Sequence, residues 1–212
     1  MDDRGIRKAE PTAETKPLRP TSVYAVNKRD HEELFLSVGA AYGIPAVALR
    51  FFNVYGERQA LSNPYTGVAA IFASRLLNDR PPLIFEDGDQ TRDFVDVRDI
   101  TRACVLALTK DGADGRTLNV GTGVPTSVRD VARVIAGGLG KSIEPEVVNQ
   151  YRAGDIRHCY ADTRLAEELL DFRAEIAFEQ GMADLLAWLE GREAMDTVDA
   201  AREALVARGL AR

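Results

Sequence analysis

Two side chains near the start of the chain have the types and spacing needed for proton transfer. Tyr24 and Lys28 are four residues apart in a segment that predicts a helix, so their side chains share one face. A free tyrosine has a pKa of about 10, which is too high for a base near neutral pH. A neighbouring ammonium favours the phenolate, so such a pair can move a proton to or from a hydroxyl group. A solvated tyrosine and lysine would have the same spacing, and the pair alone does not decide between the two interpretations.

Two short segments later in the chain carry an arginine close to an aspartate. One is Arg92-Asp-Phe-Val-Asp96 and the other is Arg152-Ala-Gly-Asp155. Arginine suits a phosphate group because its planar guanidinium donates two parallel hydrogen bonds. Arg92 could instead form a surface salt bridge with Asp89 or Asp96. The residue types therefore allow an anion site without requiring one.

The overall composition bears on the class of partner. The chain has 212 residues, of which 45% are hydrophobic and 28% charged, with a formal net charge of −6 and an isoelectric point near 5.1. These values are typical of a globular protein that buries a core. A nucleic-acid-binding protein needs a basic surface, so the acidic balance disfavours that partner. A small anionic ligand remains compatible, because a few local arginines can hold phosphates on an acidic protein.

Cysteine and histidine usage indicates a cytoplasmic protein without a metal. The cysteines are Cys104 and Cys159, the histidines are His31 and His158, and no C-x-x-C motif occurs. This pattern favours neither a disulfide scaffold nor a metal site and fits a reducing compartment. The N-terminus holds no apolar region of a secretory signal, and no stretch approaches 18 apolar residues, so we expect no membrane span.

The hydrophobic pattern predicts an α/β fold. Residues 1–20 are polar and rich in proline, which predicts a loop or disorder. A helix capped by Thr21 or Ser22 is expected to reach Tyr42, and the apolar run 44–49 is typical of a parallel strand covered on both faces. Such a strand needs sheet neighbours, and the residues before it supply none. Further helices are predicted over 67–78, 97–109, 162–170, 179–190 and 192–208, and another begins after a cap at Thr126 or Ser127. Strands are predicted over 83–85, 94–95 and 117–120.

Five segments occur in an order that resembles the extended short-chain dehydrogenase/reductases of the NAD-dependent epimerase/dehydratase family. The resemblance covers about residues 17–190 and is nearest to the UDP-glucose 4-epimerase-like or dTDP-sugar epimerase-like members. The segments are Tyr24-Ala-Val-Asn-Lys28, Leu49-Arg-Phe-Phe-Asn-Val-Tyr-Gly56, Leu83-Ile-Phe85 with Gly88, Arg92-Asp-Phe-Val-Asp96 and Arg152-Ala-Gly-Asp155.

The resemblance implies the C-terminal part of a Rossmann-type fold with a small substrate-binding domain. Residues 1–20 are then a polar leader, 21–66 the end of the dinucleotide-binding domain, and 67–190 mostly the substrate-binding domain. Rossmann elements are interleaved over about 96–123, and 191–212 form a helical tail. The chain contains no G-x-G-x-x-G or G-x-x-G-x-x-G motif. That absence implies that the N-terminal dinucleotide-binding half of the family fold is missing.

The resemblance also implies roles for single residues. In the complete family member, Tyr24 as phenolate removes the proton of the sugar 4-hydroxyl while hydride passes to NAD, and Lys28 holds the nicotinamide ribose. Phe52 lies by the nicotinamide, which makes it a further cofactor-binding residue. The substrate-binding residues are Asn53, Arg92 and Arg152 at the diphosphate, Asp155 at a ribose hydroxyl, and Asn63 and Phe85.

The function expected from this resemblance is that of a fragment of an NAD-dependent nucleotide-sugar epimerase. It would act on a nucleoside-diphosphate sugar through a 4-keto intermediate and be inactive alone. A 4,6-dehydratase or reductase of the same family is an alternative, because the residues that separate them lie upstream in the family. A non-catalytic nucleotide-sugar-binding or protein-interaction module is a second alternative. The partner expected is a second copy of the chain, or a complementing chain that carries the missing half.

Overall fold

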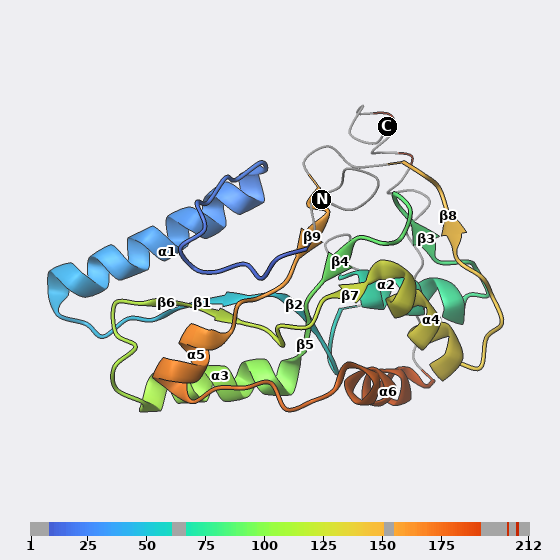
Figure 1. Cartoon of the computed structure of the whole chain (residues 1–212). Coiled ribbons are helices and arrows are strands. Elements are labelled where there is room, and N and C mark those ends of the chain that lie inside the picture. Colours follow the sequence, from blue (N-terminus) through green and yellow to red (C-terminus); the bar gives the residue numbers. More distant parts are fainter. Residues whose placement is uncertain (1–8, 61–66, 151–154, 192–202, 204–206, 208–212) are drawn as a thin grey trace.

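The computed structural model describes residues 9–60, 67–150 and 155–191, together with Glu203 and Ala207. It is an α/β fold, as the sequence predicts, and the alternation of helices and strands is visible in Figure 1. The helices are α1 (Val23–Tyr42), α2 (Val68–Leu77), α3 (Val97–Thr109), α4 (Val128–Gly138), α5 (Arg164–Leu170) and α6 (Phe178–Leu189). The strands are β1 (Ala48–Phe51), β2 (Asn53–Tyr55), β3 (Leu83–Ile84), β4 (Thr91–Arg92), β5 (Phe94–Asp96), β6 (Thr117–Val120), β7 (Thr126–Ser127), β8 (Glu146–Val147) and β9 (His158–Cys159).

Most strand pairs are parallel, and they form small sheets. β1 pairs with β6, β2 with β5 and β3 with β8, while β4 lies between β9, which is parallel to it, and β7, which is antiparallel. The chain passes from the first of these sheets to the second at Phe52. Phe52 N donates to Val120 O at 3.1 Å, whereas Asn53 N donates to Asp93 O at 2.8 Å. Two adjacent residues are therefore fixed to two different sheets.

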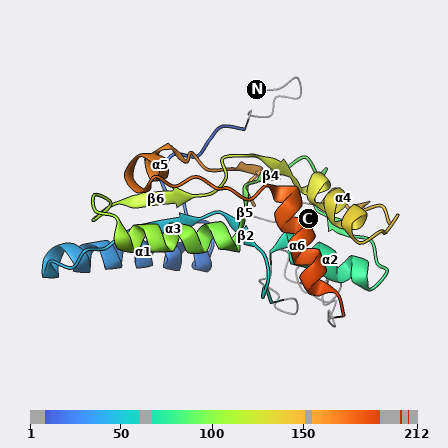
Figure 2. The ribbon, with the colours of Figure 1, turned by 90° about the horizontal axis from the view of Figure 1, so that it is seen from below.

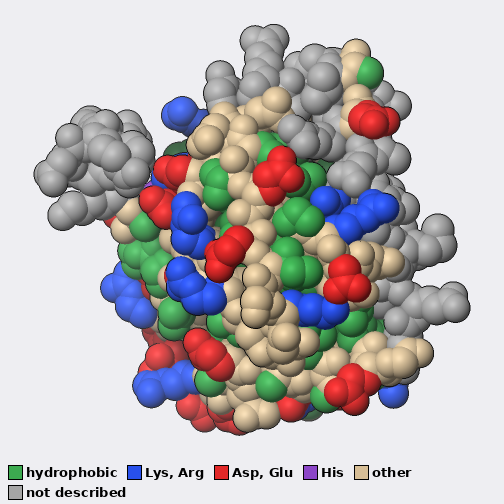
Figure 3. All heavy atoms as spheres, turned by 90° about the vertical axis from the view of Figure 1, so that its right-hand side faces the viewer, with side chains coloured by type: hydrophobic (Ala, Val, Ile, Leu, Met, Phe, Trp, Pro, Cys, Tyr) green, Lys and Arg blue, Asp and Glu red, His purple; other side chains and the backbone are tan. Residues whose placement is uncertain are grey.

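Two hydrophobic cores hold these sheets. One core gathers apolar side chains of β6, α3 and α5, such as Leu118, Ile100 and Leu170. The other is built from α2, α4 and α6 around Tyr55 and Phe94. Figures 1 and 2 both place α2, α4 and α6 at one end of the molecule and α1, α3 and α5 at the other. On the face beyond α2 and α4, Figure 3 shows basic and acidic side chains interspersed among hydrophobic ones.

Helix α1 begins and ends where the sequence predicts. The Ser22 side chain accepts a hydrogen bond from Ala25 N, and Gly43 ends the helix at φ 66°, a conformation that glycine adopts without strain. Gly39 is the one residue of α1 that is buried. Tyr24 and Tyr42 are 70% and 76% exposed. Along most of its length the helix therefore has a face that no described element covers.

The expected strand over 44–49 differs from the observed one. β1 comprises residues 48–51, its side chains are half-buried or exposed, and Ile44 is 58% exposed. The expectation that this segment is covered on both faces is therefore wrong for the described part of the chain. Among the described residues α1 is the main helix against β1, so the two faces of the strand are covered only in part. β6 is its only described strand neighbour, so its other edge is open.

The polar segment before α1 is more ordered than its composition predicts. Thr12 N donates to Tyr160 O at 2.8 Å, and Asp162 N donates to Thr12 O at 3.0 Å. The Glu14 carboxylate accepts a hydrogen bond from Asn119 N at 2.8 Å, on β6. Residues 9–20 thus form a loop anchored to β6 and to the chain after β9, while residues 1–8 lie outside the described residues.

Two helical glycines should respond in opposite ways to alanine. At Gly181 in α6, a Cβ would lie 2.6 Å from Asp96 Oδ2 and closer still to Tyr55 Oη, and both of those side chains are buried. We expect Gly181→Ala to lower the free energy of unfolding by about 1–3 kcal/mol through overpacking. At Gly137 in α4 nothing lies within 4 Å of the added Cβ, so Gly137→Ala should raise it by about 0.5–1 kcal/mol. Urea unfolding measures both, and changes of the same sign would contradict the packing of α6 on β2.

Candidate functional site

Arg92 is the centre of the candidate anion site. Its side chain is 16% exposed, and its Nη1 donates to Thr91 O at 2.9 Å and to Arg157 O at 3.2 Å. Its Nη2 forms an ion pair with Asp155 Oδ1 at 2.8 Å. The alternative pairing with Asp89 or Asp96 is wrong, since Arg92 pairs with neither. The structure thus brings together two residues that the sequence places 63 positions apart.

Asp93 positions the strand that carries Arg92. Its carboxylate is fully buried and accepts hydrogen bonds from Thr122 N (2.8 Å), Thr122 Oγ1 (2.7 Å), Gly123 N (2.9 Å) and Ala161 N (3.0 Å). Its backbone carbonyl accepts the Asn53 N–H described above. One buried residue therefore joins β2, the turn after β6 and the chain after β9. Sequence reasoning missed this role, because none of these partners is near Asp93 in the chain.

Arg157 is a second arginine in this region. Sequence reasoning predicted Arg92 but missed Arg157. Its guanidinium donates to Glu86 Oε2 at 2.6 Å and to both carboxylate oxygens of Asp87, at 2.7 and 2.8 Å. Hydrogen bonding to Arg157 lowers the pKa of Asp87 to about 2. This pair fixes the turn between Phe85 and β4 against β9. The only signal in the sequence was its closeness to Asp155.

His158 is packed into the same region, beside Thr91. His158 Nδ1 lies 2.9 Å from Thr91 Oγ1, across the β4–β9 pair. Burial lowers the pKa of His158, and the nearby positive charges of Arg157 and Arg92 lower it further. The neutral ring therefore adds no charge to the group of arginines around it at neutral pH.

The remaining predicted residues fall into three groups. Phe52 and Asn53 lie at the bend between β1 and β2, and Asn53 is in register with Phe94 on β5, the strand that begins two residues after Arg92. Phe85 begins the turn before β4, and its carbonyl oxygen accepts a hydrogen bond from Gln90 Nε2 at 2.8 Å. Asn63 and Arg152 lie outside the described residues. Asn53, Arg92 and Asp155 thus gather around β4 and β5.

Tyr24 and Lys28 lie apart from this group, on α1. They share a face of the helix, as the spacing predicts, and Lys28 Nζ lies 5.6 Å from the centroid of the Tyr24 ring. This is a cation–π contact, with the ammonium over the ring. No described element faces the pair from the other side. The described residues therefore form at most one wall of an NAD site. Because the sequence also carries no glycine-rich phosphate loop, the residues present do not fit the whole cofactor.

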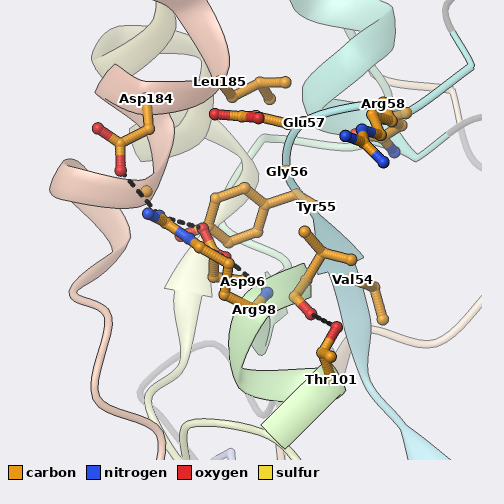
Figure 4. Close-up of a pocket in the computed structure, with 13 residues that line it drawn as sticks. Val54, Tyr55, Gly56, Glu57, Arg58, Asp96, Arg98, Thr101, Asp184 and Leu185 are labelled. Carbon is orange, nitrogen blue, oxygen red and sulfur yellow. Dashed lines mark hydrogen bonds and ion pairs between the residues drawn. The ribbon is translucent and has the colours of Figure 1, made fainter. Parts of the chain in front are cut away.

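A separate pocket of about 620 Å³ opens at the C-terminal end of β2, and none of the predicted residues that the structure describes lines it. In Figure 4, Arg98 lies between Asp96 and Asp184, and it bonds Asp96 at 2.9 Å and Asp184 at 2.8 Å. Tyr55 lines this pocket, and its pKa is raised, chiefly by burial and also by the charge of Asp96. Arg98 ties α3 to α6 and thereby joins the two cores.

The described residues offer neither a cluster of metal-binding side chains nor a membrane-spanning helix. No group of three histidine, cysteine, aspartate or glutamate side chains there has an arrangement suited to a metal ion. None of the helices in this part of the chain is both long and apolar enough to cross a membrane.

Comparison with known proteins agrees with this fold. The fold defines the class of Rossmann-type α/β proteins that includes nucleotide-sugar epimerases. A family model described as "NAD dependent epimerase/dehydratase family" matches residues 2–121. The chain belongs to the NAD-dependent epimerase/dehydratase family.

Two curated relatives illustrate the similarity. The dTDP-L-rhamnose 4-epimerase of Burkholderia thailandensis is 37% identical over 176 residues, which are 82% of this chain and 48% of that protein. The UDP-glucose 4-epimerase of Mycolicibacterium smegmatis is 37% identical over 190 residues, which are 89% of this chain and 59% of that protein. The chain thus spans about half the length of these relatives.

Solved structures agree. The UDP-glucose 4-epimerase of Thermotoga maritima with UDP-glucose superposes with a TM-score of 0.80 at 33% identity, covering 87% of this chain and 58% of that one. The UDP-glucose 4-epimerase of Thermus thermophilus in complex with NAD gives 0.76 at 31% identity, covering 88% and 60%.

Proposed function

We propose that this chain supplies the substrate-binding part of a nucleotide-sugar 4-epimerase. The observation that carries the proposal is the Arg92 guanidinium, which two backbone carbonyls hold in place beside Asp155. The chain after Arg92 continues into β5, which pairs with the strand of Asn53. A fixed, partly buried guanidinium is suited to a phosphate group because it donates paired hydrogen bonds in a set direction. The epimerase names of the relatives support the same conclusion.

In this proposal each residue has a defined task. Arg92, Arg152 and Asn53 hold the diphosphate, and Asp155 accepts a hydrogen bond from a ribose hydroxyl. Phe85 and Asn63 contact the substrate. Tyr24 moves the proton of the sugar 4-hydroxyl, while Lys28 keeps a positive charge beside it, and Phe52 flanks the cofactor. NAD, when bound by the complete enzyme, supplies the acceptor and donor of hydride.

The proposal includes a partner that covers α1 and β1. The support is the open edge of β1 and the exposed face of α1, which together offer hydrogen-bonding groups and apolar side chains to another polypeptide. That polypeptide is a second copy or a chain that carries a glycine-rich loop. Both cysteines are free, which supports a reducing, cytoplasmic setting.

Isothermal titration calorimetry with UDP and dTDP tests the substrate part. We expect the 212-residue chain to bind one of these nucleotides, and Arg92→Gln to weaken that binding by about tenfold or more, since charge-assisted hydrogen bonds to phosphate are lost. Arg133→Gln is the matched control, because Arg133 is exposed on α4 and pairs with Asp130. Flat titrations with both nucleotides would refute the proposal.

A non-catalytic binding module is the second candidate, and the exposure of Tyr24 with no described wall opposite favours it. The two are separated in a fusion that places the N-terminal half of a related epimerase in front of this chain, by mass spectrometry of the small molecules released on denaturation and by turnover. Stoichiometric NAD released from the purified fusion supports the enzyme. Nucleotide binding without released NAD, and without turnover of UDP-galactose or dTDP-rhamnose, supports the binding module.

A further inference from the structure

We propose that Arg50 is a positioning residue, which holds the Glu32 carboxylate and thereby keeps it from drawing Lys28 away from Tyr24. Arg50 lies on β1 and acts on the pair through Glu32, which is on α1. The inference rests on the proposed function, in which Lys28 keeps a positive charge beside Tyr24, and it adds what leaves Lys28 free to do so.

Three side chains of α1 lie on one face of the helix, because Tyr24, Lys28 and Glu32 follow one another at intervals of four residues. Long side chains in a helix lean toward its N-terminus, so Lys28 leans over the turn of Tyr24 and Glu32 leans over the turn of Lys28. A lysine and a glutamate at this spacing attract one another. The spacing therefore offers Lys28 two partners, the Tyr24 ring and the Glu32 carboxylate.

The structure shows Lys28 with the first of these partners. Lys28 Nζ lies 5.6 Å from the centroid of the Tyr24 ring, and within the described ranges Lys28 forms no ion pair. The Glu32 carboxylate is taken by Arg50 instead. Its Oε2 accepts a hydrogen bond from Arg50 Nε at 2.8 Å, and its Oε1 accepts one from Arg50 Nη2 at 2.7 Å and a longer one from Thr117 Oγ1 at 3.2 Å.

Arg50 is a stronger partner for Glu32 than Lys28 would be. Its guanidinium donates two parallel hydrogen bonds, which one ammonium cannot do in the same fixed geometry. The Glu14 carbonyl helps to orient it by accepting a hydrogen bond from Nη1 at 3.1 Å. The side chains of Arg50 and Glu32 are only 24% and 17% exposed, so water and salt screen their attraction less than that of an open surface pair.

Removal of Arg50 would leave a half-buried carboxylate without its main partner. An unpaired charge in such a position is unfavourable, and a nearby cation can compensate it. Lys28 is one helical turn away on the same face, and its exposed side chain is free to swing. We therefore expect Lys28 to move toward Glu32 when Arg50 is lost, and Tyr24 to lose its positive neighbour.

Proton NMR of the 212-residue chain tests this inference through the Hε atoms of Lys28. In the wild type the Tyr24 ring current should shift these protons upfield. We expect that shift to fall by about a third or more in Arg50→Met, because the ion pair with Glu32 now competes, and to recover as salt is added. The double variant Arg50→Met/Glu32→Gln should regain the wild-type shift, because the competing charge is gone.

Arg29→Met is the matched control, because it removes an arginine directly next to Lys28 in the chain. Arg29 pairs with Asp30 and Glu33. These two carboxylates are two and five residues from Lys28, so they do not face it when Arg29 is lost. We expect this control to keep the wild-type shift.

Arg50→Gln is a milder second variant, for use if circular dichroism shows that Arg50→Met does not fold. Glutamine keeps a hydrogen-bond donor near the Glu14 carbonyl but carries no charge. It should show a smaller loss of the Lys28 shift, which Glu32→Gln should again reverse.

The reversal separates positioning from simple packing. A shift that stays lost in the double variant would overturn the inference, since Arg50 would then only hold α1 against β1. An unchanged shift in Arg50→Met, or no ring-current shift in the wild type, would overturn it as well. None of these outcomes depends on nucleotide binding, so the proposed function stands or falls separately, by the calorimetry with UDP and dTDP.

Discussion

Replacement of Tyr24 by phenylalanine should lower turnover by about 10²–10⁴-fold in a complete enzyme assembled around this chain, since the group that moves the proton is lost. The complete enzyme can be made by fusing the N-terminal part of the M. smegmatis relative in front of this chain, because the two are 37% identical where they align. The rate of UDP-galactose conversion is the measurement. Binding of UDP should be unchanged, because Tyr24 lies on α1 and the Arg92 site lies around β4.

Tyr42 provides the matched control for this variant. It lies at the other end of the same helix and is exposed to a similar degree, at 76%. Tyr42→Phe should leave turnover within about twofold of the unmodified fusion, which is the usual size of a surface effect. A Tyr24→Phe fusion that turns over as fast as the Tyr42→Phe fusion would show that Tyr24 is a solvated residue without a catalytic role.

Asp93→Asn should strongly destabilise the folded chain. Each carboxylate oxygen of Asp93 accepts two hydrogen bonds. An amide NH₂ in place of either oxygen would face two donors and could not accept a hydrogen bond from them. Leaving buried donors without a partner costs about 1–3 kcal/mol each. We expect a loss of about 3 kcal/mol in the free energy of unfolding, measured by urea denaturation.

The control for Asp93→Asn is the same substitution at an exposed aspartate. Asp111 lies in the exposed loop between α3 and β6. Asp111→Asn should change the free energy of unfolding by less than about 0.5 kcal/mol. Equal midpoints for the two variants would mean that the Asp93 hydrogen bonds do not hold β2, β6 and the chain after β9 together.

Elements whose signals are local could be predicted from the sequence. Helix α3 runs from Val97 to Thr109, as expected, and the Asp96 side chain caps it by accepting a hydrogen bond from Arg98 N at 2.9 Å. Strand β6 also has its predicted bounds, 117–120. The shared face of Tyr24 and Lys28 follows from helical spacing alone. In each case the residues that decide the outcome lie within a few positions of one another.

Features that depend on distant partners could not be predicted. The two-residue strands β4, β7 and β9 are too short to show a hydrophobic period, and each exists because another segment pairs with it. The partner of Arg92 is 63 positions away, and the sequence offered the nearer Asp89 and Asp96 instead. The roles of Asp93 and Arg157 depend in the same way on contacts that only the folded chain creates.

The anchored loop before α1 has a consequence for synthesis of the protein. Glu14 is held by Asn119, 105 residues later, and Thr12 is held by Tyr160 and Asp162. A ribosome adds about 5–20 residues per second, so on the order of ten seconds pass between the emergence of Thr12 and that of its partners. Contacts between such distant residues also form slowly once both are present. Throughout that interval the loop before α1 lacks the contacts with β6 and with the chain after β9 that hold it in the folded protein.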